Sequence, residues 1–286
     1  MHPALTQWKS SGRYFQYRGH SIFYKTEGAG TPLLLLHGFP TSSWDWSSLW
    51  AALNDKYQLI ALDFIGFGLS DKPRHYAYSL QDQAELTEQL LKHVGISRYH
   101  ILAHDIGDSV AQELLARKFD RKSNQILSCC FLNGGLFPET HRPTRAQKLL
   151  LGPFGFLISR LFSYRAFSKS FSIIFFQPPS EEELRCHYEL ITYHNGHRIA
   201  YKLIRYILER RVNRERWLAA IQHANCPLLL IDGVSDPVSG AHMVKRYREL
   251  VPQSQVVEIE GCGHYPQMEK PELVLQAYLT FRGNLE

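Results

Sequence analysis

The stretch RYHILAHDIGDSVAQELLARKF, residues 98–119, contains the transition that decides the fold. Its first seven residues, RYHILAH, are predicted to form a strand, and residues 108–119 are predicted to form the helix that follows it. Ala103 and Gly107 each lie two positions from the central Asp105. Small residues in this pattern allow a strand to turn sharply into a helix, because the two backbones come into contact there. The segment therefore predicts a strand, a tight turn with Asp105 at its tip, and a helix.

Strands and amphipathic helices alternate on both sides of this segment. Two short aromatic strands are predicted within residues 13–26, and a helix is predicted at 80–94. Further strands are predicted at 32–38, 57–63, 125–133, 226–233 and 255–261. This spacing is typical of βα units, so we expect an α/β fold with a mostly parallel central sheet and helices on both faces.

The alternation stops between Gly134 and Asn225. This stretch is helical in composition, rich in Phe, Tyr, Leu and Arg, and interrupted by prolines. We interpret residues 1–133 and 226–286 as the two parts of one α/β core, and residues 134–225 as an inserted helical cap. Such a cap would lie over the carboxyl ends of the strands, where ligands bind in folds of this kind.

The composition is that of a folded globular protein without concentrated charge. The 286 residues include 32 Lys and Arg against 27 Asp and Glu, a net charge of +5, with both signs spread along the chain. We expect no nucleic acid partner, since binding to a phosphate backbone needs a basic stripe. The densest basic stretch, residues 204–217, contains interleaved acidic residues, and we interpret it as a solvated helix face.

The N-terminal segment and the cysteines favour a cytoplasmic location. Residues 1–20 lack the apolar core of a signal peptide, and five cysteines without a CxxC pair are typical of reduced thiols. The most apolar stretch, residues 149–162, is too short to span a bilayer. We interpret it as an apolar wall over a ligand pocket, with contact to a membrane surface as the less favoured alternative. The sequence does not fix the oligomeric state.

Three further loops after predicted strands carry residues suited to nucleophilic catalysis. The loop at 37–40 would place the Phe39 amide near the turn, where it and the Ile106 amide can form an oxyanion hole. Asp236 follows the strand at 226–233, and His264 follows the strand at 255–261. The order nucleophile, acid and histidine, each after its own strand, indicates a catalytic triad.

Ser109 offers a rival frame for the nucleophile, because Gly107 and Ala111 flank it in the same way. It lies four residues beyond Asp105, about one helical turn past the tip of the predicted loop. We therefore interpret Ser109 as a surface or packing residue.

Five motifs together resemble the aspartate-nucleophile branch of the α/β-hydrolase superfamily, which contains epoxide hydrolases and haloalkane dehalogenases. They are HGFPTSSWDW (37–46), LDFIGFGLSDKP (62–73), AHDIGD (103–108), DGVSDPV (232–238) and GCGHYPQMEKPE (261–272). The resemblance covers nearly the whole chain, and NGGLFPETHRP at 133–143 is similar to the mesoderm-specific transcript subgroup. It implies an α/β-hydrolase fold with Asp105 as nucleophile, Asp236 as acid, His264 as base and 134–225 as the cap.

A carboxylate nucleophile restricts the reaction by ordinary chemistry. With a reference pKa of about 3.9 it is ionised at neutral pH and needs no base in order to attack. Attack on an sp³ carbon gives an alkyl ester, which water activated by His264, with Asp236 orienting the ring, can cleave. No metal ion and no organic cofactor are needed. We expect a hydrolase that opens a small apolar epoxide to a diol.

The leaving group decides between the two reactions of the resembled branch. Its dehalogenases bind the halide with side chains at the positions of Phe39 and Ile106, and neither side chain here can donate a hydrogen bond. Its epoxide hydrolases protonate the alkoxide with two cap tyrosines, for which Tyr206 is the first choice and Tyr201 the alternate, while Phe154 lies in the segment where the other tyrosine is expected. Haloalkane dehalogenation is the alternative reaction, and a non-catalytic ligand-binding or scaffolding protein is the alternative of another class.

Overall fold

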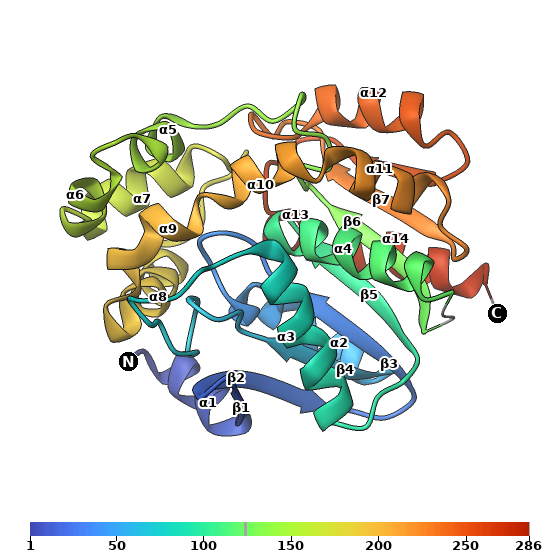
Figure 1. Ribbon diagram of the computed structural model, residues 1–286, viewed down its shortest axis with the longest axis horizontal. Coiled ribbons are helices and arrows are strands. Elements are labelled where there is room, and N and C mark those ends of the chain that lie inside the picture. Colours follow the sequence, from blue (N-terminus) through green and yellow to red (C-terminus); the bar gives the residue numbers. More distant parts are fainter. Residues whose placement is uncertain (123–124, 286) are drawn as a thin grey trace.

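A single eight-stranded sheet forms the centre of the computed structural model, which describes residues 1–122 and 125–285 (Figure 1). The strand order is β1-β2-β4-β3-β5-β6-β7-β8. Strand β2 is antiparallel to both of its neighbours, and every other adjacent pair is parallel. The strands are β1 (Arg13–Tyr17), β2 (His20–Glu27), β3 (Thr31–Leu36), β4 (Tyr57–Leu62), β5 (Tyr99–His104), β6 (Ile126–Leu132), β7 (Leu228–Gly233) and β8 (Gln255–Ile259). The predicted mostly parallel sheet is confirmed.

Helices cover both faces of this sheet, as the alternating pattern predicts. One face packs on α1 (Pro3–Ser11), α2 (Ser47–Asn54) and α14 (Pro271–Gly283), and the other on α3 (Leu80–His93), α4 (Ile106–Asp120), α11 (Arg214–Gln222) and α12 (Ala241–Leu250). Two short helices, η1 (Ser43–Trp46) and α13 (Pro266–Glu269), lie in loops. Strand β3 shows why both faces are apolar: Leu34 and Leu36 join one core and Leu33 and Leu35 the other, because successive side chains point to opposite faces.

A group of short helices lies between β6 and β7 and gathers beyond the carboxyl ends of the parallel strands (Figure 1). They are α5 (Arg145–Leu151), α6 (Gly155–Arg160), α7 (Tyr164–Ser172), α8 (Glu181–Thr192), η2 (Tyr193–Ile199), α9 (Ala200–Leu203) and α10 (Tyr206–Val212). We refer to α5 through α10 as the cap helices. The helix that follows them, α11, packs against α4 beside the sheet.

Residues 149–162 do not form the predicted wall over a pocket. Leu149, Phe154, Phe156, Leu157 and Leu161 are all exposed. Helix α5 buries none of its residues and α6 buries only Gly155 and Ser159, so the large apolar side chains of this stretch stay at the surface. Within the part of the chain that the structure describes, no helix combines the length and apolar character needed to cross a bilayer.

The turn after β5 has the geometry that the sequence predicts. Asp105 adopts φ 47° and ψ −103°, a left-handed conformation that a non-glycine residue rarely takes, and helix α4 begins at the next residue. Gly107 lies against the end of β3: a Cβ atom at Gly107 would be 2.4 Å from the backbone oxygen of Leu36. The turn therefore depends on the absence of a side chain at this position.

Replacing Gly107 with alanine should therefore destabilise the protein. The new methyl group would force β3 and α4 apart, and we expect the free energy of unfolding to fall by roughly 1–3 kcal/mol, as for other overpacked sites. Urea unfolding monitored by circular dichroism measures this change. Gly283→Ala is the matched control, since a Cβ atom there meets nothing within 4 Å. Equal effects of the two substitutions would show that the contact with Leu36 does not constrain the turn.

Candidate active site

The carboxyl ends of the parallel strands bring the predicted site residues together. Asp105 follows β5 directly, and Phe39 lies in the loop after β3. Asp236 follows β7, and His264 follows β8. All four residues are buried, and Asp105 and His264 lie close enough for their charges to act on each other.

Backbone amides surround one side of the Asp105 carboxylate. The Phe39 N–H donates to Asp105 Oδ2 at 3.0 Å. Ile106 is the first residue of α4, so its N–H has no acceptor within the helix. These are the two amides predicted to form an oxyanion hole, and the first of them already holds a carboxylate oxygen.

Arg210 of α10 holds the other side of Asp105, and we did not predict this role. Its Nη2 donates to the Asp105 backbone oxygen at 2.8 Å and to Asp105 Oδ1 at 3.1 Å. Its Nε donates to Ser109 Oγ at 2.7 Å. Arg210 is only 1% exposed, so the interpretation of residues 204–217 as a solvated face is wrong at this position. Ser109 is also buried and pairs with Arg210, which makes it a packing residue rather than a surface residue.

The surroundings keep Asp105 ionised. Burial raises the pKa of this carboxyl group, but the opposing effect of the Arg210 charge, with smaller contributions from His264, His104 and the Phe39 amide, lowers it to about 2. The carboxylate is therefore charged at neutral pH and requires no proton acceptor before it can attack an electrophile.

The His264 side chain is oriented by Asp236. His264 Nδ1 lies 2.7 Å from Asp236 Oδ2, and since a carboxylate only accepts, Nδ1 donates and Nε2 remains for a substrate or water. Asp236 also accepts from the Val238 and Ser239 amides, the Ser239 hydroxyl and the Asn133 side chain. Burial lowers the pKa of His264, but Asp236 and then Asp105 outweigh it, so the pKa is raised and an imidazolium that forms when Nε2 takes up a proton is stabilised.

Two further contacts fix the loop that carries His264. His104, next to the nucleophile in sequence, approaches the His264 backbone oxygen through Nε2 at 2.8 Å. Burial lowers the pKa of His104 to about 3, so its ring is neutral and Nε2 donates. The His264 N–H donates to the backbone oxygen of Ile174, between α7 and α8. The cap segment and the core therefore position the histidine jointly.

Tyr206 begins α10 and is the cap tyrosine nearest to this centre among those predicted. Its ring lies 5.6 Å from the Phe39 ring, and the Arg210 guanidinium lies 4.6 Å from its ring centroid. Burial and the Asp105 charge raise the pKa of its hydroxyl, whereas Arg210 and Gln147 lower it, and the net direction is upward. This hydroxyl is buried, and Gln147 is the polar side chain that acts on it. Tyr201 lies on α9, half-buried.

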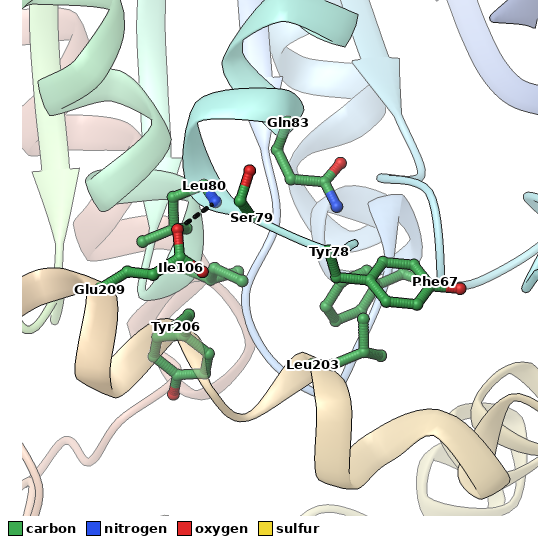
Figure 2. A pocket seen from close by; sticks show the side chains of 9 residues that line it. All are labelled: Phe67, Tyr78, Ser79, Leu80, Gln83, Ile106, Leu203, Tyr206 and Glu209. Carbon is green, nitrogen blue, oxygen red and sulfur yellow. Dashed lines mark hydrogen bonds between the residues drawn. The ribbon is translucent and has the colours of Figure 1, made fainter. Parts of the chain in front are cut away.

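Figure 2 shows the pocket beside the turn that follows β5. Leu203, Tyr206 and Glu209 line it from the cap, and Ile106 lines it from the turn; the remaining lining residues are Phe67, Tyr78, Ser79, Leu80 and Gln83. Glu209 links the cap to the core at this pocket, because its carboxylate accepts a hydrogen bond from the Leu80 N–H at 2.8 Å. The space in it that a water molecule can occupy is only about 10 Å³, enough for about one water molecule. Leu203, Tyr206 and Glu209 of the cap helices therefore close this space over Ile106.

Sequence reasoning missed Arg210 and Asn133. In α10 the buried residues Tyr206 and Arg210 are four positions apart, and this helical spacing is a signal that Arg210 lies on the apolar face. Asn133 follows β6 directly, as Asp105 follows β5, and that position was a signal for its role beside Asp236. Among residues 1–122 and 125–285 no three His, Cys, Asp or Glu side chains are grouped in a way that could hold a metal ion.

Comparisons with known proteins agree with this architecture. A model of the alpha/beta hydrolase family matches residues 33–277. The mesoderm-specific transcript protein of Mus musculus is 41% identical over 294 residues, which cover 98% of this chain and 88% of that protein. The resemblance found in the motifs is confirmed.

Solved structures show the α/β-hydrolase fold. The epoxide hydrolase CorEH has a TM-score of 0.77 and 22% identity, with 96% of this chain and 99% of that chain covered. A loop variant of the haloalkane dehalogenase DbeA from Bradyrhizobium elkanii has a TM-score of 0.79 and 20% identity, with 96% and 97% covered. At identities this low the likeness establishes the fold and leaves the reaction to the site itself.

The ion pair between Arg210 and Asp105 predicts a pH-dependent loss of stability in Arg210→Met. At neutral pH this variant leaves a buried carboxylate without its partner, so we expect the free energy of unfolding to fall by about 3–5 kcal/mol. Without Arg210, burial raises the pKa of Asp105 instead of leaving it lowered. The difference from wild type should therefore shrink as the pH falls from the raised pKa of Asp105 in the variant toward about 2, its pKa in the wild type, because the carboxyl group then becomes protonated.

Urea unfolding at a series of pH values measures this difference. Arg211→Met is the matched control, because Arg211 is exposed on the same helix and should give no pH-dependent loss. A deficit in Arg210→Met that is the same at every pH would mean that Arg210 only fills space.

Proposed function

Because the chain belongs to the alpha/beta hydrolase family, we propose that it hydrolyses a small apolar epoxide to a diol through a covalent ester on Asp105. One observation carries the proposal. The residue at the tip of the nucleophile turn is a carboxylate with a pKa of about 2, and His264 and Asp236 lie beside it. A carboxylate that attacks an sp³ carbon gives an ester that water can cleave, whereas attack on an acyl carbon would give a mixed anhydride.

The contacts of Asp105 assign different tasks to its two oxygens. Oδ2 accepts from the Phe39 N–H, the amide that would hold an oxyanion, so this oxygen becomes the ester carbonyl. Oδ1 is the attacking atom, and its contact with Arg210 Nη2 loosens as its charge passes into the new bond with carbon. As that bond forms, the carbon–oxygen bond of the epoxide breaks.

Tyr206 donates the proton that the opening epoxide requires. Its hydroxyl has a raised pKa and so keeps its proton until an alkoxide, a stronger base than phenolate, develops beside it. In the second step His264 Nε2 takes a proton from water, and the resulting hydroxide attacks the carboxyl carbon of the ester. The Phe39 and Ile106 amides hold the oxyanion, and Asp236 stabilises the imidazolium. When the tetrahedral intermediate collapses, the bond between the carboxyl carbon and the alkyl oxygen breaks. That oxygen takes the proton from His264 and leaves as the diol, and the proton of the re-formed Asp105 carboxyl group returns to the Tyr206 phenolate.

A second reaction, removal of halide from a haloalkane by the same two steps, is favoured by a different observation. The Arg210 Nη1 group is buried and has no hydrogen-bond partner within the described ranges. A departing halide needs N–H donors and no proton, and Nη1 can supply them although Phe39 and Ile106 side chains cannot.

His264→Gln tests the two-step mechanism. Since His264 is needed only to activate water, Asp105 should still open the substrate, and the ester should persist. Intact-protein mass spectrometry after incubation with an epoxide that the wild type hydrolyses should show an adduct of one substrate mass, and peptide mapping should place it on Asp105. The styrene-oxide class and fatty epoxides are suitable probes.

Asp105→Asn, assayed when freshly prepared, is the control and should form no adduct and turn over no substrate, because a neutral amide does not attack carbon. A missing adduct in His264→Gln, with a substrate that the wild type demonstrably turns over, would refute the ester intermediate. A binding or scaffolding protein would leave every probe chemically unchanged in wild type and variants alike.

Tyr206→Phe separates the two electrophiles. Loss of the proton donor should slow ester formation from an epoxide by roughly 10²-fold to 10⁴-fold, while a haloalkane should react at an unchanged rate. Stopped-flow measurement in the His264→Gln background isolates this first step. Tyr201→Phe is the matched control, and a loss there instead would transfer the role to Tyr201. Equal losses on both electrophiles would mean that Tyr206 only shapes the pocket.

A further inference from the structure

The tip of the cap exposes an unusual amount of apolar surface. Five large side chains on and around α5 and α6 are exposed; they are Leu149, Phe154, Phe156, Leu157 and Leu161, and we call them the cap tip. Leu161 is 76% exposed and Phe154 66%. Elsewhere exposed large apolar residues are scattered, whereas these fall within thirteen consecutive residues, and α5 and α6 lie at one end of the molecule in Figure 1. Clustered exposure of this kind marks an interaction site.

The chain around the cap tip has only one sign of charge. Residues 140–180 contain no Asp or Glu, and they contain six basic residues: Arg142, Arg145, Lys148, Arg160, Arg165 and Lys169. The whole chain has a net charge of +5 and this segment alone contributes +6, so the remaining residues sum to −1. The excess positive charge of the protein is therefore concentrated in the stretch of chain that contains the cap tip.

These basic side chains are also unpaired, whereas several arginines elsewhere are held in ion pairs. Arg117 pairs with Glu85, Glu88 and Glu113, and Arg214 pairs with Glu139. None of the six basic residues of 140–180 forms an ion pair with any residue that the structure describes. Their charges are thus free to pair with an anionic partner outside the chain.

We propose that the cap tip docks the protein onto the surface of a membrane that contains anionic lipids. Apolar side chains of α5 and α6 enter the boundary between headgroups and acyl chains, and the flanking Lys and Arg side chains contact lipid phosphates and carboxylates. A lipid surface fits better than a protein partner because it matches both features of the cap tip at once. Its acyl chains accept the apolar side chains, and its anionic headgroups pair with the basic ones. The inference does not depend on the reaction proposed above.

Docking at this position would place the membrane next to the helices that close the active site. Helix α6 packs against α9, and Leu203 of α9 lines the pocket beside Tyr206. Ser159 of α6 also donates to the backbone oxygen of Arg198. The cap tip and the pocket therefore lie on opposite sides of the same small group of helices. A ligand dissolved in the membrane would approach these cap helices, which must move to admit it.

Flotation with lipid vesicles tests the proposal. The wild-type protein should float with vesicles of phosphatidylcholine containing about a third phosphatidylserine, and less with pure phosphatidylcholine. The double variant Phe154→Ser with Leu161→Ser should bind the mixed vesicles at least about tenfold more weakly, because each large side chain contributes substantially when buried in lipid. Lys148→Glu with Arg160→Glu should remove the preference for phosphatidylserine.

Phe119→Ser with Val212→Ser is the matched control, since both side chains are exposed apolar residues outside the cap tip, and it should bind like wild type. Circular dichroism verifies that each variant is folded. Failure of the wild type to bind either vesicle would overturn the proposal, as would unchanged binding by the Phe154 and Leu161 variant. A dimer in light scattering that this variant abolishes, without vesicle binding, would also overturn it and assign the cap tip to a second copy of the chain.

Discussion

The rest of the structure depends on one buried charge, the carboxylate of Asp105. A carboxylate without partners in the interior would cost several kcal/mol, and it would then be protonated rather than reactive. Three parts of the chain prevent this: the loop after β3 supplies the Phe39 amide, helix α10 supplies Arg210, and the loop after β8 supplies His264. The left-handed turn at Asp105 holds the carboxylate where these three meet. Because two partners come from the core and one from the cap, closure of the cap and ionisation of Asp105 are linked.

The core was predictable because its signals are local. Buried strands such as β3 contain continuous apolar runs, here residues 33–36, and the turn residues Ala103 and Gly107 are small for a steric reason that is visible in the sequence. The burial of Arg210 was not predictable in this way, because the charged residues on either side of it are typical of a solvent-exposed helix. Only the packing of α10 against the turn after β5 buries this side chain. Its spacing from Tyr206 was the sole local trace.

The cap was predictable as a helical insertion but not in detail. Helices of six to nine residues, such as α6 and α7, carry too few turns for a periodic pattern to define their ends. Their apolar residues also do not all face inward: Phe167 and Phe171 enter a core with Tyr265, whereas Phe154 and Leu161 face outward. Both sets of residues are equally apolar, so their composition does not predict which side chains are buried and which are exposed. Only the three-dimensional structure distinguishes them.

Helix α10 places two different donors beside the nucleophile. The Tyr206 hydroxyl can give a proton to an alkoxide, and the Arg210 Nη1 group can donate hydrogen bonds to a halide but cannot give up a proton under ordinary conditions. The two groups are in contact, with the guanidinium over the tyrosine ring, so any ligand that reaches one lies near the other. A carbon–halogen bond needs only charge stabilisation to break, whereas an epoxide must also be protonated. Burial keeps the proton on Tyr206, whose ring lines the pocket, whereas Arg210 Nη2 is engaged by Asp105 and Nη1 lies against Gly135, so the phenol is the donor better placed for a substrate. This difference between the two donors is the physical reason to favour an epoxide over a haloalkane as the substrate.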